Sequence, residues 1–300
     1  MQPRYPIYIP SKGRHDIEPS WSTVHALSKD GVPFHLVVEP QEEDAYRAAF
    51  PTADLLVMPE ETHARSAVPA RNFSRDHSVA AGAKRHWTLD DNMGRFTRLY
   101  KGKRVPCHAG TALRCVEDFT DRYTNIGIAG LSYEMFAPST TKTPFILNCH
   151  VYSCALIWNE MPYRHRGLYN ADTDLCLQVL SGGLCTVAFN VFLVAKRWTM
   201  QMPGGNTEAL YQGDGRLHMA RSLERAWPGV VTTKRRYQRA QHVIKGTWRG
   251  FDTPLQRRAD IDFDALPTVD EYGLELAQVR DEIRSPAVRR LFSDYQRDGQ

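Results

Sequence analysis

The chain has 300 residues, of which 42% are hydrophobic and 10% aromatic, and its formal net charge is +4. This composition excludes a disordered or fibrous protein and predicts one large domain, or a domain with an appendage. The longest apolar run, residues 187–195, is too short to span a bilayer, and the start of the chain does not resemble a leader. We therefore expect a soluble, cytoplasmic protein with no membrane partner, and nothing indicates an obligate protein partner.

The cysteines contain no C-x-x-C pair of the kind that binds zinc. The chain has six cysteines, and most of them lie inside apolar runs; they are Cys107, Cys115, Cys149, Cys154, Cys176 and Cys185. This pattern favours reduced, buried thiols over a disulfide framework or a zinc site.

The first hundred residues alternate apolar runs with helix-like stretches. The pattern predicts strands at 4–10, 32–40, 54–60 and 86–91, and helices at 21–29, 42–50 and 71–85. Such units form a mostly parallel sheet, in which ligands bind beyond the carboxyl ends of the strands. The polar segments after these strands are therefore expected along one edge, at 10–14, at Glu39 and at 90–92.

The later half of the chain is less regular. Strands are predicted at 125–133, 144–159 and 184–198, and a helix that begins with acids and ends in glycines at 170–183. A glycine-rich loop, 200–207, follows. The end of the chain, 268–300, predicts two amphipathic helices packed on the domain.

Two adjacent carboxylates, Asp90 and Asp91, follow a buried strand directly. They repel one another unless they share a cation or reach solvent, and a divalent metal that also binds a diphosphate is suited to that place. The alternative is a turn in which one acid is a cap and the other is solvated. Adjacent residues of a strand point in opposite directions, so we expect only one to face a metal, and favour Asp91.

A second acidic cluster, Asp172 and Asp174, lies at a predicted helix start, where carboxylates can also serve as N-caps. The segment 8–14 offers backbone donors, a hydroxyl and two cations at a strand end, which suits a nucleotide. Arg75, near the start of another helix, could meet a diphosphate bidentately, with helix capping by Asn72 or Ser74 as the plainer reading.

The segment 232–258 carries eight Lys or Arg against one acid, with Tyr237, His242, Trp248 and Phe251 between them. Cations interleaved with aromatic rings suit phosphate contacts and stacking on bases. A solvated charged face anchored by a few rings is an equal alternative from this segment alone.

Taken together, "YIPSKGR" (8–14), Glu39, "RNFSRDHSVAAGAKRHWTLDDN" (71–92) and "YNADTDLCLQVL" (169–180) resemble the TET-associated glycosyltransferases, mainly of bacteriophages. The resemblance runs from Arg4 to Trp198 and more loosely beyond. It implies an α/β, GT-A-like fold, with a Rossmann-like, mostly parallel central sheet flanked by helices. Members are understood to attach sugars to hydroxymethylated cytosine in phage DNA, after an earlier oxygenase or hydroxymethylase step.

The resemblance also implies a domain plan and a nucleotide-sugar-dependent hexosyltransferase activity. Residues 1–230 would form the catalytic domain, with a nucleotide-sugar-binding half, 1–100, and an acceptor half, 101–230. Residues 231–300 would be a basic and helical extension on the same domain.

Site residues follow from the resemblance. The UDP-sugar donor would be bound by Pro10, Ser11, Arg14, Glu39, Asn72, Arg75 and Asp90, and Mn²⁺ or Mg²⁺ by Asp91 and Asp90, with His218 or Asn206 as a third ligand. Asp172 or Asp174 would be the acid facing the acceptor, and 204–207 a mobile loop over the donor. The DNA would contact Lys234, Arg235, Arg236, Arg239, Lys245, Trp248 and Arg249.

Two other interpretations stay open. The same fold could act on a protein, lipid or polysaccharide acceptor, or the chain could be a non-catalytic nucleic-acid-binding module with a degenerate nucleotide site. The sugar and the stereochemistry of transfer are open as well.

Overall fold

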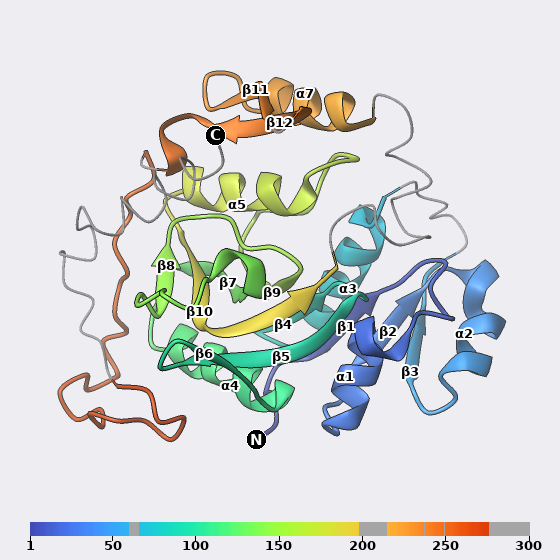
Figure 1. Cartoon of the computed structure of the whole chain (residues 1–300), viewed down its shortest axis with the longest axis horizontal. Coiled ribbons are helices and arrows are strands. Elements are labelled where there is room, and N and C mark those ends of the chain that lie inside the picture. The colour runs from blue at the N-terminus through green and yellow to red at the C-terminus, as the bar shows by residue number, and fades with distance from the viewer. Residues whose placement is uncertain (60–65, 198–214, 237, 249, 276–300) are drawn as a thin grey trace.

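The computed structural model describes residues 1–59, 66–197, 215–236, 238–248 and 250–275 (Figure 1). A ten-stranded sheet crosses the molecule in the order β3-β2-β1-β4-β9-β7-β10-β5-β6, with β8 paired to β10. Its strands are β1 (Ile7–Pro10), β2 (His35–Val38), β3 (Asp54–Val57), β4 (Arg85–Leu89), β5 (Met93–Tyr100), β6 (Lys103–Pro106), β7 (Ile126–Tyr133), β8 (Phe145–Leu147), β9 (Cys154–Trp158) and β10 (Cys185–Lys196).

The sheet is mixed, so the prediction of a mostly parallel sheet was wrong beyond the first four strands. β3, β2, β1 and β4 are parallel, as the first hundred residues predicted, and so are β7 and β10. β9 and β5 run against their neighbours. β5 follows β4 after only residues 90–92, but the two strands are not neighbours, because β9, β7 and β10 lie between them in the sheet.

Helices cover both faces of the sheet. α1 (Thr23–Lys29) and α4 (Ala109–Thr120) pack together on one face, and α2 (Glu43–Ala49) packs against β3. α3 (Val68–Ala80) and α5 (Ala171–Ser181) lie on the other face, where α3 contacts β1 and β4 and α5 contacts β7 and β10. Figure 1 shows α5 and α4 on opposite sides of the sheet.

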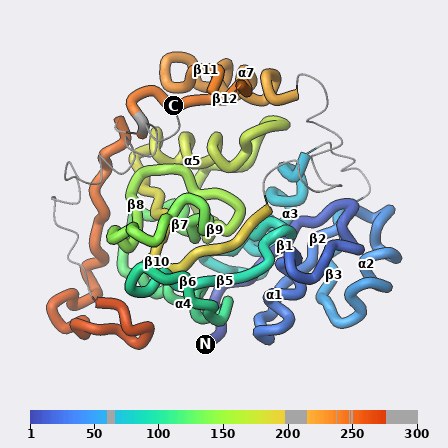
Figure 2. The backbone as a smooth tube through the Cα atoms, in the orientation of Figure 1, coloured from blue at the N-terminus to red at the C-terminus, as the bar shows by residue number. Residues whose placement is uncertain are grey.

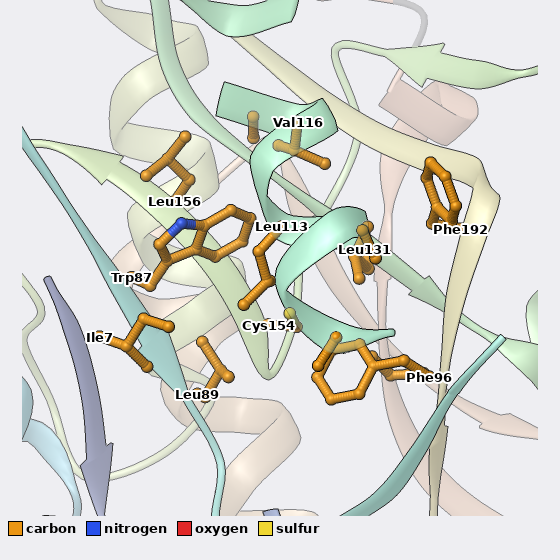
Figure 3. Close-up of a cluster of buried hydrophobic side chains, with 14 of the residues drawn as sticks. Ile7, Trp87, Leu89, Phe96, Leu113, Val116, Leu131, Cys154, Leu156 and Phe192 are labelled. Carbon is orange, nitrogen blue, oxygen red and sulfur yellow. The ribbon is translucent and has the colours of Figure 1, made fainter. Parts of the chain in front are cut away.

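The main core lies between α4 and the sheet. Figure 3 shows Leu113 and Val116 of α4 among Trp87, Leu131 and other apolar side chains from the strands. Leu113 and Trp87 are fully buried. Alternate residues of each strand point toward this core, because side chains alternate between the faces of a sheet.

Replacing Leu113 by alanine is expected to lower the free energy of unfolding by about 2–5 kcal/mol, because it removes buried methyl groups and leaves a cavity. Urea unfolding followed by circular dichroism measures the change. The exposed Val105 of β6 is the control, and its change to alanine should have little effect. Equal stability of Leu113→Ala and the wild type would contradict the assigned core.

A further layer lies outside α5. It consists of α7 (Gly215–Ala226) and a two-stranded antiparallel hairpin of β11 (Val231–Arg236) and β12 (Arg239–Ile244). Leu177 of α5 packs against Leu223, Val231 and Ile244 of this layer. Figures 1 and 2 show the hairpin and α7 above α5, so the basic segment is held on the body of the protein by apolar contacts.

Several predictions concern the rest of the chain. The predicted domain boundary at residue 230 falls between α7 and β11, which pack together. Residues 268–275 contain turns and a bridge between Val269 and Glu275 instead of a predicted helix, and 276–300 lie outside the described residues.

All six cysteines are free, and all except the partly exposed Cys107 are buried. No helix within the described ranges is long and apolar enough to cross a membrane.

Candidate active site

The carboxyl ends of β1, β4, β7 and β10 meet at one edge of the sheet. β4 and β7 each run antiparallel to β9, so they are parallel to one another, and β10 is parallel to β7. Asp90 after β4, Tyr133 at the end of β7 and Lys196 at the end of β10 therefore share this edge. Ser153 joins them, because it precedes the antiparallel β9.

Asp90 is surrounded by cations and hydroxyls. Its carboxylate accepts hydrogen bonds from Arg71 Nη2 at 2.8 Å, from Ser153 Oγ at 2.5 Å and from Lys196 Nζ. Its backbone N–H donates to the Ser153 carbonyl at 2.8 Å. The side chain of Asp90 is 24% exposed, so it is within reach of a ligand at this edge.

Arg71 joins the two acidic clusters that the sequence singled out. It lies in the first turn of α3, is only 7% exposed, and donates from Nη1 to Asp172 and from Nη2 to Asp90. Asp172 lies in the first turn of α5, and its side chain is 28% exposed. The fold therefore brings Asp90 and Asp172 together across one buried guanidinium.

The two carboxylates have opposite pKa shifts. Burial raises the pKa of Asp90, but Lys196 and Arg71 outweigh it and hold that pKa well below its usual range. Burial also raises the pKa of Asp172, and there Arg71 offsets it only in part, so the net shift is upward. Burial lowers the pKa of Lys196, but Asp90 outweighs it, so the ammonium stays charged. Carboxylates whose pKa values are driven apart can take different roles in one reaction.

Asp91 points away from Asp90, as strand alternation predicted. It is buried, and it accepts hydrogen bonds from Ser11 Oγ at 2.7 Å and from Arg14. Burial is the main reason that the pKa of Asp91 is raised, and Arg14 opposes the shift. Thr23 at the start of α1 fixes the turn, because its Oγ1 donates to the Asp90 carbonyl and its N–H to the Asp91 carbonyl.

The predicted donor segment forms a loop after β1. Pro10 ends β1, and the Ser11 N–H donates to the Val37 carbonyl of β2 at 2.9 Å. Glu39 after β2 is buried and accepts from Lys12 Nζ at 2.7 and 2.9 Å. Loop 10–14 and Glu39 thus lie together at the carboxyl ends of β1 and β2, as predicted.

Two predicted site residues make contacts that hold the fold together. Arg75 donates to the carbonyls of Asn159, Met161 and Tyr163 in the loop after β9. Asn72 donates to the His165 carbonyl in the same loop, at 2.9 Å. Their predicted roles toward a donor stay predictions, and Arg71 is the arginine of α3 that the structure places at Asp90.

Asp174 is buried and anchors the outer layer. It accepts hydrogen bonds from Arg166 at 2.9 and 3.1 Å, from Gln178 at 2.7 Å and from Trp227 Nε1 at 2.7 Å. Two of these donors come from the loop before α5 and from the segment after α7. Of the two predicted acceptor-side acids, Asp172 is therefore the one beside Asp90.

Comparison with known proteins agrees with the resemblance seen in the sequence. The sequence profile of the TET-Associated Glycosyltransferase family matches residues 5–205, more than half of the chain. The chain belongs to this family. No curated protein matches the sequence. A solved structure described as the crystal structure of a mycobacterial protein is similar to this chain, with 12% sequence identity and a TM-score of 0.47. The matched region covers 80% of this chain and 83% of the chain in that structure.

Membership of the TET-associated glycosyltransferases implies an enzyme that transfers a glycosyl group. The matched range includes β1 to β10, and therefore Asp90, Arg71, Asp172 and Lys196. The family profile stops before α7 and the basic hairpin.

The surroundings of Asp90 in this glycosyltransferase do not fit a divalent metal ion. Asp90 and Asp91 point to different partners, and each already pairs with side-chain cations. The described part of the chain holds no group of three acid, histidine or cysteine side chains suited to a metal. His218 is exposed on α7, and Asn206 and loop 204–207 lie outside the described residues. The predicted Mn²⁺ or Mg²⁺ therefore stays a prediction without support from these contacts.

The predicted DNA-binding cations of this glycosyltransferase gather on the hairpin. Near its tip, Arg236 pairs with Arg239 and Arg235 with Ala240 in register. Lys234, Arg235, Arg239 and Lys245 are exposed, and Arg236 is partly exposed. Within the described ranges none of these five cations pairs with a carboxylate. Arg249 lies outside the described residues.

Trp248 is part of the packed structure at the base of the hairpin. It ends the short 3-10 helix η4 (Lys245–Trp248), and its ring lies 5.8 Å from the His150 ring and 6.1 Å from the Phe251 ring. It is partly buried. The ring thus connects the hairpin to the body of the protein.

Sequence reasoning missed four residues that contact or lie beside Asp90, namely Arg71, Ser153, Lys196 and Tyr133. Arg71 lies one helical turn before the predicted Arg75, on the same face of α3, and was not singled out. Lys196 lies two residues before the end of the predicted strand 184–198, and a strand-end rule applied there would have pointed to it. Ser153 had no such signal, because it lies inside a run predicted as continuous strand.

Proposed function

We propose that this protein transfers a sugar from a UDP-sugar to the hydroxymethyl group of 5-hydroxymethylcytosine in DNA, through a GT-A-like site. The observation that carries the proposal is the cluster of Asp90, Arg71, Asp172 and Lys196 at the carboxyl edge of the sheet. Sheets of this class bind ligands at that edge, and family membership supplies glycosyl transfer.

Donor binding is assigned to the loop after β1. In an α/β sheet, the loops after the first two strands are suited to a nucleoside and its phosphates. Ser11, Lys12 and Arg14 bring a hydroxyl and two cations there, and Glu39 can accept from sugar or base hydroxyl and amine groups. The diphosphate would then extend toward Arg71 and Lys196.

Transfer requires one bond to form as another breaks. The acceptor hydroxyl oxygen attacks the anomeric carbon, the bond from that carbon to the diphosphate oxygen breaks, and the nucleoside diphosphate leaves with the electron pair. Arg71 and Lys196 stabilise the negative charge that develops on the leaving group. Asp172 accepts the hydroxyl proton, a role suited to an inverting displacement and to its raised pKa.

The acceptor is assigned as DNA because of the hairpin. Four cations on the hairpin and Lys245 directly after it, anchored by apolar contacts at the base of the hairpin, form a surface suited to phosphates. Phosphate contacts position a protein on DNA without reading sequence. We therefore expect binding to hydroxymethylated DNA with little sequence preference outside the target base.

Replacing Lys234, Arg235 and Arg239 by alanine together is expected to weaken DNA binding strongly at low salt. If each contacts one phosphate, the slope of log affinity against log salt concentration should fall by about 2.7, at about 0.9 per lost contact. Fluorescence anisotropy at several salt concentrations measures this slope. An unchanged slope would contradict the hairpin as the phosphate-binding surface.

The test of the reaction is direct. The protein is incubated with hydroxymethylcytosine DNA and a panel of UDP-sugars, in parallel with Mn²⁺ and with EDTA, and the nucleosides are analysed by mass spectrometry. A mass gain of one hexose or one N-acetylhexosamine supports the proposal and identifies the sugar. Unmodified nucleosides with every donor would overturn it.

Two outcomes separate the competing interpretations. Transfer to a protein, lipid or polysaccharide, with no retention on DNA, would replace the acceptor and keep the donor site. Full function of Asp90→Ala, Asp91→Ala and Asp172→Ala variants in DNA binding, with no transfer by the wild type, would indicate a non-catalytic module.

A further inference from the structure

A row of aromatic rings joins the basic hairpin to the carboxylate cluster. From the hairpin side, the Trp248 ring lies 5.8 Å from His150, His150 lies 4.3 Å from Tyr152, and Tyr152 lies 5.7 Å from Tyr133 at an interplanar angle of 17°. The rings come from η4, from the segment before β9 and from the end of β7.

Tyr133, at the end of the row away from the hairpin, contacts the residues around Asp90 directly. The Lys196 ammonium lies 5.6 Å from the centre of the Tyr133 ring, and the Tyr133 hydroxyl and Ser153 Oγ are 2.5 Å apart. Both Lys196 and Ser153 donate to Asp90. A group stacked on this row would therefore lie next to the atoms that the proposed transfer uses.

Phe136 gives the row an exposed face. It ends the 3-10 helix η3 (Glu134–Phe136), and its ring lies 5.2 Å from Tyr133, 6.1 Å from Tyr152 and 6.2 Å from His150. It is 37% exposed, whereas the three rings beside it are partly buried. An exposed aromatic ring packed over three others offers a flat face to a ligand.

The row suits a base and not a phosphate. Burial lowers the pKa of His150 to about 4, with a smaller effect of His242, so the imidazole is neutral at pH 7. Apart from Lys196, which is already paired with Asp90, no Lys or Arg belongs to the row, and the cations assigned to DNA phosphates lie on the hairpin and in η4. Rings stack on any base, because every base has a π face.

We propose that Phe136, Tyr133, Tyr152 and His150 form the acceptor-base site, on which the target cytosine stacks after it has left the DNA duplex. The inference rests on the proposed function and deepens it. A base inside a duplex is covered on both faces by its neighbours, so it can stack on a protein ring only when it is extruded. Unstacking costs a few kcal/mol, and stacking on a protein ring returns about 1–3 kcal/mol per base.

In this arrangement two surfaces contact the DNA, the hairpin at its phosphates and the aromatic row at the target base. The hairpin holds phosphates on both sides of the target, and the row carries the base inward, so that its hydroxymethyl group reaches Asp172 and the sugar carbon beside Asp90. Phe136 presents the exposed ring on which the base stacks. Tyr133 and Tyr152 pack behind Phe136, with ring centres 5.2 and 6.1 Å from it, and hold that ring in place.

The first test compares Phe136→Leu with Phe136→Tyr. Leucine keeps an apolar side chain but removes the π face, so transfer to hydroxymethylcytosine duplex at low DNA concentration should fall about 5- to 150-fold. Tyrosine should stay within a few-fold of the wild type. Donor hydrolysis to water and UDP binding should be unchanged in both. Tyr100→Leu, at an exposed ring of β5, is the matched control and should have no effect.

The second test works whether or not sugar is transferred. An abasic site opposite the target base removes its pairing partner, so extrusion costs less. Wild-type protein should bind this duplex more tightly than the paired duplex, and Phe136→Leu should lose that difference. Equal binding of both duplexes by the wild type, or equal activity of Phe136→Leu and wild type, would overturn the base site. A preference for the abasic duplex with no transfer from any donor would support the site and overturn the reaction.

Discussion

Replacing Asp172 by asparagine is expected to lower the rate of sugar transfer by about 10²- to 10⁴-fold, the usual contribution of a general base. Asparagine keeps the shape and can still accept a hydrogen bond from Arg71, but it cannot take the proton of the attacking hydroxyl. Binding of UDP and of DNA should be little changed. Single-turnover transfer to hydroxymethylcytosine DNA measures the rate, and calorimetry measures the binding of UDP.

Asp174→Asn is the matched control, two residues further along the same helix. Asp174 accepts from Trp227, Gln178 and Arg166, so its change should lower the free energy of unfolding by about 1–3 kcal/mol. Its transfer rate per folded molecule should stay near that of the wild type. A larger loss of transfer in Asp174→Asn than in Asp172→Asn would reverse the assignment.

The pH dependence gives an independent check on Asp172. A general base acts only when it is deprotonated, and burial raises the pKa of Asp172 above the ordinary carboxyl value. The rate should therefore rise with pH through a limb that lies above the usual range for aspartate, and Asp172→Asn should abolish that limb. Asp90 cannot produce it, because Lys196 and Arg71 hold the pKa of Asp90 below the usual range.

The strand-end rule found much of the candidate site from sequence alone. It placed loop 10–14, Glu39 and Asp90 at one edge, because the carboxyl ends of parallel strands meet there. It also explained why Asp90 and Asp91 have different partners. Both inferences needed only the apolar pattern of each strand and the rule that ligands bind at the carboxyl edge of a parallel sheet.

Partners far apart in sequence were not predictable in the same way. Arg71 contacts Asp172 across 101 positions, and Lys196 contacts Asp90 across 106, and no local pattern records such pairs. The stretch 93–120 received no assignment, although β5, β6 and α4 lie there. β5 pairs antiparallel with β10, and β9 with β4 and β7, so the sheet is mixed, which only the tertiary packing decides.

The proximity of Lys196 and Arg71 also changes the expected chemistry. A glycosyltransferase that relies on a metal needs ligands that are free to bind it, yet Asp90 already shares two buried cations. We infer that these side chains supply the positive charge for the leaving diphosphate. Transfer by the wild type should therefore persist in EDTA, at a rate similar to that with Mn²⁺.

Replacing Lys196 by methionine is expected to lower the transfer rate by about 10²- to 10³-fold, as is usual when one preorganised donor to a developing negative charge is removed. Methionine keeps the length and the apolar stem, and Arg71 still pairs with Asp90, so the fold should hold. UDP binding should weaken as well, because the ammonium lies where the diphosphate would be. Lys196→Arg keeps the charge and should retain more activity than methionine. Loss of all wild-type transfer in EDTA, with recovery in Mn²⁺ and normal activity of Lys196→Met, would show that a metal supplies the charge and that Lys196 only neutralises Asp90.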